Sequence, residues 1–229
     1  MFRRDYVVLV ITLVLIFSIA VYAFSEFGIP GLRDENITPL TAVEIRDYEG
    51  EPLSSIADFR ENSIRGPQYV NPGDYHLTIT GLVDQPLSLS YDQVLDRYPH
   101  YTKKVTLYCV EGWDVTILWE GVLVEDILAE AQVRPEADTV IFIAADGYST
   151  SLPLAYLRDR DIMIAYAMNG VTLPPERGFP FQLVAEDRWG YKWIKWVTAI
   201  EVSADPAYRG YWESRGYSQE ADNTRGFFD

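Results

Sequence analysis

The sequence has few of the residues that most often build nucleophilic and metal-binding sites. It contains one cysteine, Cys109, and two histidines, His76 and His100, among 229 residues. A lone cysteine cannot form a disulfide within the chain, so disulfide cross-links do not hold this fold together. A hydrolase with a cysteine nucleophile needs a histidine base, and only these two could serve. No hydrolase signature surrounds either one, which leaves this alternative weak.

Basic residues are also scarce. The chain has 19 lysines and arginines against 34 acidic residues, which gives a formal net charge of −15. A nucleic-acid binder needs a basic surface that displaces counterions, so we expect no nucleic-acid partner. The charge also argues against broad binding to anionic lipid headgroups. A small anionic ligand would need a local basic pocket that works against the overall field.

The N-terminal segment is the longest apolar run in the chain. Residues 7–24 carry no charge, and as a helix they would span about 27 Å, close to a hydrocarbon core of about 30 Å. Arg3 and Arg4 precede the run, which predicts a cytoplasmic N-terminus with the domain outside. We therefore predict a membrane anchor or export signal in residues 1–25. Cleavage after the small residue Ala23 would release a secreted protein instead.

The rest of the chain predicts an α+β domain. Prolines and glycines interrupt residues 26–58, which we interpret as a linker, and the domain should cover residues 59–204. Residues 205–229 lack periodicity and should wrap over the surface as a C-terminal segment. Strands are expected at residues 75–83, 103–109, 139–145, 149–152, 162–168, 181–185 and 196–203, and helices at 91–98 and 124–131. Short helices scattered among many strands favour mixed β-sheets over regular βαβ units.

Cys109 lies between two aromatic residues in the stretch Tyr-Cys-Val-Glu-Gly-Trp, residues 108–113. It is either an inert buried thiol or, as a thiolate, a soft ligand for a transition metal. Two other polar segments occur at residues 59–63 and 177–182. A third, residues 189–196, contains two lysines and three tryptophans. Its Gly-Tyr-Lys start could seat a phosphate between backbone amides and a point charge.

Taken in this order, the segments resemble the sulfite oxidase-like molybdopterin oxidoreductases. The stretch at residues 108–113 is similar to the molybdenum-ligand segment of this family, and closest to the form found in exported methionine sulfoxide reductase catalytic subunits. Residues 119–122 resemble its Trp-x-Gly-Val stretch, residues 177–180 its His-Gly-Phe-Pro turn, and residues 190–192 its pterin-phosphate Gly-x-Lys. The resemblance covers residues 59–217, most of the chain, and implies the fold of that family.

The resemblance implies a Mo-molybdopterin cofactor and a specific set of residues. Cys109 would ligate the molybdenum. The residues implied for binding the cofactor are Arg60, Glu61, Asn62, Cys109, Arg177, Gln182, Gly190, Tyr191 and Lys192, and those implied for catalysis are Cys109, Arg60 and Tyr217. Arg177 replaces the usual histidine of the family and Gln182 its usual arginine. The positive charge has therefore moved five positions, and the geometry of phosphate binding should differ.

The implied reaction moves an oxygen atom to or from a small sulfur oxo compound, with a sulfoxide reductase favoured over a sulfite oxidase. The 229 residues contain no segment similar to the haem domain or the C-terminal sandwich domain of sulfite oxidases. We therefore expect a separate electron-transfer partner, such as a membrane cytochrome or a quinone-linked protein. The enzyme would act at the extracytoplasmic face of the membrane. The alternative is an exported binding or structural protein that keeps the fold without catalysis.

Overall fold

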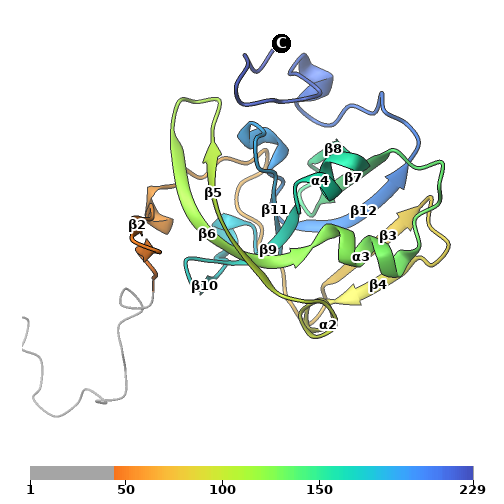
Figure 1. Cartoon of the computed structure of the whole chain (residues 1–229), viewed down its shortest axis with the longest axis horizontal. Helices are drawn as coiled ribbons and strands as arrows, with labels where there is room; N and C mark the ends of the chain where they lie inside the picture. The colour runs from red at the N-terminus through yellow and green to blue at the C-terminus, as the bar shows by residue number, and fades with distance from the viewer. Residues whose placement is uncertain (1–43, 229) are drawn as a thin grey trace, which may run out of the picture. The chain divides into compact units, whose positions relative to one another are not determined.

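A computed structural model describes residues 44–228 of the chain (Figure 1). The expected N-terminal helix and the first part of the linker lie outside these residues. The described part contains two five-stranded sheets and a short two-stranded ribbon formed by β1 (Asp47–Tyr48) and β2 (Glu51–Pro52). Short helices lie between the strands. This arrangement confirms the α+β class with mixed sheets.

The first sheet contains the hairpin that carries Cys109. Its strands are β5 (Tyr101–Tyr108), β6 (Asp114–Leu123), β9 (Met163–Met168), β10 (Val171–Thr172) and β11 (Gln182–Val184). All of its pairs are antiparallel, in the order β10-β9-β6-β5, with β11 also paired to β9. The β5–β6 pair forms the long curved hairpin in Figure 1. Its last pair joins Tyr108 to Asp114, which places Cys109 at the hairpin tip.

The second sheet has the order β4-β3-β12-β7-β8. Its strands are β3 (His76–Gly81), β4 (Leu87–Ser90), β7 (Thr139–Ala144), β8 (Ser149–Pro153) and β12 (Val197–Ser203). The central strand β12 runs parallel to β3 and antiparallel to β7. Residues 189–196 therefore lie just before the central strand of this sheet.

The helices are short, as the sequence predicts. They are α2 (Tyr91–Arg97), α3 (Val124–Ala131) and α4 (Leu154–Asp159), with 3-10 turns η2 (Ile56–Asp58), η3 (Pro175–Arg177), η4 (Gly190–Lys192) and η5 (Glu213–Arg215). Ser90 and Gln93 form a capping box at the start of α2. The apolar face predicted for α3 is buried. None of the helices within residues 44–228 has the length and apolar character needed to cross a bilayer.

The sequence patterns missed the short strands β1, β2 and β10, the strands β4 and β6, and the helix α4. β6 is central in its sheet, and Ile117, Leu118 and Trp119 are buried in succession. Its register also shifts between Glu120 and Gly121. A strand buried on both faces shows no alternation of polar and apolar residues, so the period-two signal is absent.

Residues 44–58 pack on the first sheet through Asn169, which is fully buried. The Asn169 amide nitrogen donates to a Glu44 carboxylate oxygen at 3.1 Å and to the Ser54 carbonyl at 2.9 Å. Its amide oxygen accepts from the Leu118 backbone N–H at 3.0 Å. These contacts fix the path of the chain as it enters the domain. The predicted boundary between linker and domain, at residue 59, remains a prediction.

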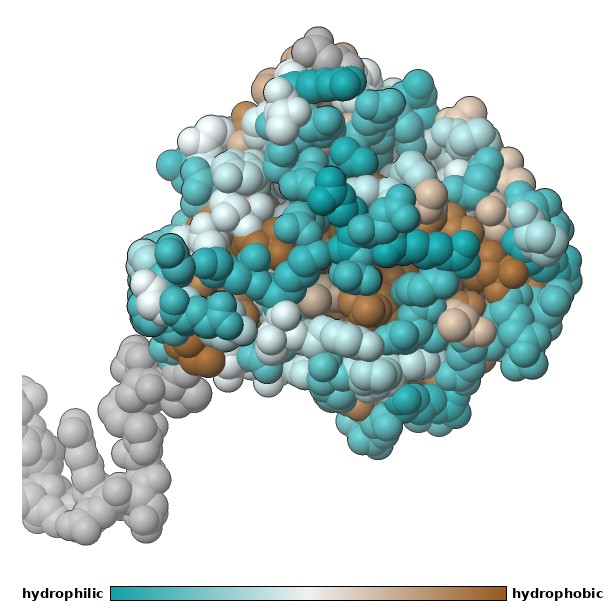
Figure 2. Space-filling model, in the orientation of Figure 1, coloured by the Kyte–Doolittle hydropathy of each residue, from teal (hydrophilic) through white to brown (hydrophobic). Residues whose placement is uncertain are grey.

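Large apolar side chains from both sheets make up the core. The largest fully buried side chains include Trp119, Trp196, Phe142 and Phe181. The face in Figure 2 is mostly hydrophilic, and hydrophobic residues show mainly in a band across its middle. Because the chain buries this much aromatic surface, the core needs no disulfide to be stable.

The packing of β6 on β9 gives a first prediction. A methyl group on Gly121 would lie 2.3 Å from the Ile164 carbonyl oxygen and 2.8 Å from the Ala165 Cα. We expect Gly121→Ala to lower the free energy of unfolding by about 2–3 kcal/mol, because the strand backbone must shift. In Gly73→Ala the new methyl group meets only a side-chain oxygen at 3.5 Å, so stability should be unchanged. Equal urea midpoints for the two variants would contradict this packing.

Candidate active site

Cys109 lies in a tight turn at the tip of the β5–β6 hairpin. Its N–H donates to the Trp113 carbonyl at 2.9 Å, and its carbonyl accepts from the Gly112 N–H at 3.0 Å. Gly112 has a φ of +81°, a left-handed conformation that glycine adopts without steric cost. The turn leaves Cys109 only 7% exposed, at the wall of a cavity.

Gly190 allows the hairpin tip to approach the second sheet. Tyr108 and Trp189 form an isolated parallel bridge, and Gly190 follows directly. A Cβ on Gly190 would lie 3.2 Å from the Tyr108 carbonyl oxygen and 3.5 Å from the Cys109 Cα. The first distance is tighter than most Cβ contacts and the second is ordinary packing, so a larger residue would press on the Tyr108 carbonyl. The predicted ligand segment and the predicted Gly-x-Lys segment are therefore in direct contact.

A cavity of about 460 Å³ opens beside Cys109. Its walls come from the lead-in around Phe59, the hairpin tip, the 177–182 turn, residues 190–196 and the C-terminal segment. Eight of the ten predicted site residues line it: Arg60, Asn62, Cys109, Arg177, Gln182, Gly190, Tyr191 and Tyr217. Glu61 and Lys192 do not. The structure thus gathers segments that lie up to about 160 positions apart, while the roles of the individual residues remain predictions.

The surroundings of the thiol suit a single soft ligand. Burial raises the pKa of Cys109, and the charge of Arg60 works in the opposite direction. The Asn62 amide nitrogen lies 3.8 Å from the sulfur. Within residues 44–228, no three His, Cys, Asp or Glu side chains gather closely enough to hold a metal ion. A metal bound at Cys109 would therefore need most of its other ligands from a cofactor.

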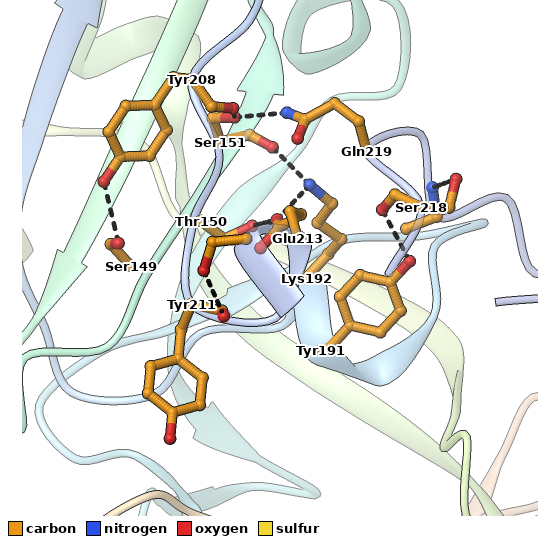
Figure 3. A network of polar contacts seen from close by, with 12 residues as sticks. Ser149, Thr150, Ser151, Tyr191, Lys192, Tyr208, Tyr211, Glu213, Ser218 and Gln219 are labelled. Carbon is orange, nitrogen blue, oxygen red and sulfur yellow. Dashed lines mark hydrogen bonds and ion pairs between the residues drawn. The ribbon is translucent and has the colours of Figure 1, made fainter. Parts of the chain in front are cut away.

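Lys192 belongs to a buried polar network and not to the cavity wall (Figure 3). Its ammonium group lies 2.5 Å from Glu213 Oε1 and donates to the Ser151 carbonyl at 3.0 Å. The Thr150 hydroxyl donates to the same carboxylate oxygen at 2.5 Å. Burial lowers the pKa of Lys192, and the charge of Glu213 opposes that shift. The network ties η4 to η5 in the C-terminal segment.

Two other cations stand at the cavity wall. The Lys195 ammonium group lies 2.9 Å from Glu61 Oε1 and 4.4 Å from the centre of the Trp196 ring. Arg177 donates to the Phe59 carbonyl at 3.0 Å and covers the Phe59 ring. Lys195 was not among the residues predicted for the site. The available signal was its position in the same lysine-containing segment as Lys192, three residues further along.

The C-terminal segment supplies an aromatic part of the wall. Tyr217 packs against Tyr191 and Trp212, with ring centres 5.2 and 5.1 Å apart. The Tyr191 hydroxyl donates to the Ser218 carbonyl at 2.9 Å. Tyr148 donates to the Tyr191 carbonyl at 2.5 Å. The contacts hold residues 205–228 against the cavity, so this segment forms part of the site.

Neither histidine supports the hydrolase alternative. His76 is exposed on β3, and His100 contacts the Tyr166 hydroxyl and the Leu95 carbonyl through its two ring nitrogens, each at 2.7 Å. Neither lines the cavity beside Cys109. A general base must reach the thiol directly or through one water. Neither histidine lines the cavity from which it could do so.

Comparison with protein families agrees with this geometry. The model "Oxidoreductase molybdopterin binding domain" matches residues 64–212, which include the hairpin tip and the 189–196 segment. An uncharacterised oxidoreductase, YuiH, of Bacillus subtilis strain 168 is 36% identical over 157 residues, 68% of this chain and 78% of that protein.

The chain also matches parts of longer proteins that are less similar to it. A putative protein-methionine-sulfoxide reductase subunit, YedZ1, of Azospira oryzae is 31% identical over 65% of this chain and 56% of its own length. Mitochondrial sulfite oxidase of Rattus norvegicus is 31% identical over 69% of this chain, but only 34% of its own length is covered. The crystal structure of sulfane dehydrogenase SoxCD from Paracoccus pantotrophus superimposes with a TM-score of 0.64 at 25% identity, over 86% of this chain and 59% of that one.

The buried network gives a second prediction. Lys192→Met leaves Glu213 as an uncompensated charge, and we expect the free energy of unfolding to fall by about 3–5 kcal/mol. The matched control is Arg97→Met, which breaks a pair with Glu130 whose side chains are 43% and 35% exposed. That change should cost no more than about 1 kcal/mol. Chemical denaturation of both variants measures the difference, and similar losses would show that the buried pair has no special weight.

Proposed function

The chain belongs to the oxidoreductase molybdopterin-binding domain family, and we propose that it moves an oxygen atom to or from a small sulfur oxo compound, most favourably as a sulfoxide reductase. Family membership confirms the resemblance, the enzyme class and the Mo-molybdopterin cofactor predicted from the sequence. In coarse terms, this is a sulfite oxidase-like enzyme for sulfur or nitrogen oxo compounds. The choice among substrates is our proposal.

The residues present fit this cofactor. Cys109 is a thiol on a cavity wall, and within residues 44–228 no three His, Cys, Asp or Glu side chains gather closely enough to hold a metal ion, which suits a metal that brings its own sulfur ligands. Gly190 leaves room where a side chain would press on the tip. The bound cofactor supplies a metal that changes by two electrons and exchanges an oxygen atom. This single thiol at the cavity is the observation that carries the proposal.

The protein's own side chains would ligate the metal, orient the substrate and shield the pocket from water. Cys109 would be the thiolate ligand. Arg60 lines the same cavity, and its planar guanidinium can donate two hydrogen bonds to a substrate oxygen. Trp113 and Trp193 line the pocket and would shield it from water, and Tyr217, which also lines it, would supply a hydroxyl that can hold a proton.

The apolar character of the walls supports an organic sulfoxide. Leu107, Trp113, Trp193 and Trp196 all line the cavity. Such side chains pack the hydrocarbon part of a sulfoxide, whereas sulfite has no hydrocarbon to bury. A relative whose name includes a methionine sulfoxide reductase subunit supports the same choice.

We also propose a separate electron-transfer partner and a position at the extracytoplasmic membrane face. The word "subunit" in the name of that relative supports the first idea. The charge and apolar pattern of residues 1–25 supports the second. The partner chemistry stays as predicted from the sequence: a membrane cytochrome or a quinone-linked protein.

Metal content and Cys109 provide the third prediction. Protein made in a cofactor-competent host should contain about one molybdenum per chain, and Cys109→Ser should abolish the thiolate-to-metal absorption band. Because outer-shell changes already cost about 10–100-fold, loss of the ligand itself should lower turnover more than about 100-fold. Thr102→Ser, on an exposed part of β5, is the control.

Turnover of methionine sulfoxide with a reduced dye, and of sulfite with an oxidised dye, separates the two directions. Faster sulfoxide reduction supports the proposal, and exclusive sulfite oxidation contradicts the favoured direction. Cofactor-loaded protein that converts neither compound would favour the non-catalytic alternative. Wild-type protein without molybdenum from a competent host would overturn the cofactor assignment.

A further inference from the structure

The Tyr217 side chain is held at the cavity by its ring and not by its hydroxyl. The ring packs on Tyr191, Trp212, Phe227 and Phe228, with centres 5.0 to 5.7 Å apart. The backbone N–H donates to the Trp212 carbonyl at 3.2 Å. Among residues 44–228, no hydrogen bond ties down the Tyr217 hydroxyl. Its place in the cavity therefore depends on what fixes the segments that carry these rings.

The buried ion pair joins the same two segments as the ring contact between Tyr191 and Tyr217. Lys192 follows Tyr191 in η4, and Glu213 begins η5, which ends just before Tyr217. The two charged groups lie 2.5 Å apart, and both side chains are fully buried. The Gly216 N–H donates to the Glu213 carbonyl at 3.2 Å, so the residue before Tyr217 is tied to Glu213 as well.

Both ends of the pair are also anchored on β8 (Figure 3). The Thr150 hydroxyl donates to Glu213 Oε1 at 2.5 Å, and the Lys192 ammonium group donates to the Ser151 carbonyl at 3.0 Å. A Cβ on Gly210 would lie 2.8 Å from Glu213 Oε2, so the C-terminal segment is packed tightly at this point. The position of η5 is therefore fixed relative to a strand of the second sheet.

Stability alone is a poor reason for burying these two charges. Glu213 Oε2 is buried and has no hydrogen-bond partner within residues 44–228. Burial also lowers the pKa of Lys192, which is the sign of a desolvation cost. Uncharged side chains can often replace a buried ion pair without loss of stability. What they do not reproduce is the fixed distance and direction that the pair sets between η4 and η5.

Resting on the proposed function, we propose that Lys192 and Glu213 are positioning residues for the reaction. By joining η4 to η5, they hold the Tyr217 hydroxyl where it donates a hydrogen bond to the oxygen of the sulfoxide. Neither residue touches the substrate, and their effect on turnover passes through Tyr217. A displacement of about 1 Å in a group of this kind can lower a rate by about 100-fold.

The decisive variant removes both charges together. In Lys192→Met/Glu213→Gln no unpaired charge is left, and the glutamine oxygen can still accept from Thr150. Full-length protein loaded in a cofactor-competent host should keep the molybdenum content and the urea midpoint of the wild type. With methionine sulfoxide and a reduced dye, kcat per bound molybdenum should fall at least about tenfold while KM stays within about threefold.

A double-mutant cycle tests whether the effect passes through Tyr217. Tyr217→Phe should itself lower kcat, because the hydroxyl is lost while the ring remains. Adding Lys192→Met/Glu213→Gln to Tyr217→Phe should then lower kcat by less than about twofold, since there is no hydroxyl left to position. A purely structural role for the pair would instead lower kcat by the same factor in both backgrounds.

Hydrogen exchange of cofactor-free protein gives a readout that does not depend on turnover. Peptides that span residues 211–219 should exchange at least about tenfold faster in Lys192→Met/Glu213→Gln, because η5 is released from η4. Peptides of α2 should be unchanged. The matched control is Arg134→Met/Asp84→Asn, which removes a pair whose side chains are 46% and 61% exposed. It should match the wild type in exchange and in turnover.

The outcomes separate this inference from the proposed function. Loss of molybdenum from Lys192→Met/Glu213→Gln would overturn the inference, because Lys192 would then act on the cofactor. Unchanged kcat in that variant or in Tyr217→Phe would also overturn it, and the proposed function would stand. Wild-type protein that holds molybdenum but converts neither methionine sulfoxide nor sulfite would overturn the proposed function, and the inference with it.

Discussion

The site depends on one close backbone contact between the two sheets. Tyr108 and Cys109 end a strand of the first sheet, and Trp189 and Gly190 lead into the central strand of the second. Glycine at position 190 favours this approach, because a Cβ there would press on the Tyr108 carbonyl oxygen at 3.2 Å. Without the contact, the thiol would sit on a free hairpin tip and the cavity would lose one of its walls.

The turn η4 gives three successive residues three different surroundings. Gly190 meets the hairpin tip, Tyr191 lines the cavity, and Lys192 enters the buried network with Glu213. Because a 3-10 turn points consecutive side chains about 120° apart, one short segment can serve all three neighbours. The C-terminal segment is thereby coupled to the thiol: η5 holds Lys192, Lys192 fixes the turn, and the turn positions Gly190 under Cys109.

The sequence predicted the elements whose patterns are local. The helix predicted at residues 91–98 is α2 (Tyr91–Arg97), which begins at the capping box of Ser90 and Gln93, and α3 has the predicted bounds. β6 escaped because both of its faces are buried. The same limit applies to the site. The order of the motifs indicates that Cys109 and Gly190 belong to one site. Which lysine faces the cavity, Lys192 or Lys195, depends on Glu213, which lies 21 positions after Lys192 in the sequence. Nothing in the local pattern separates Lys192 from Lys195.

The charges around the cavity bear on the kind of substrate it admits. Three bases line it, Arg60, Arg177 and Lys195, together with three acids, Glu111, Asp146 and Glu176. The lining is therefore balanced, within a chain of net charge −15. An anionic substrate such as sulfite would approach against the overall field without a local excess of positive charge to attract it, and the phosphate of a bound cofactor would add to that repulsion. A neutral sulfoxide meets no such barrier. It still presents an oxygen that Arg60 can bind, so the charge balance of the lining supports the neutral sulfoxide that we propose as substrate.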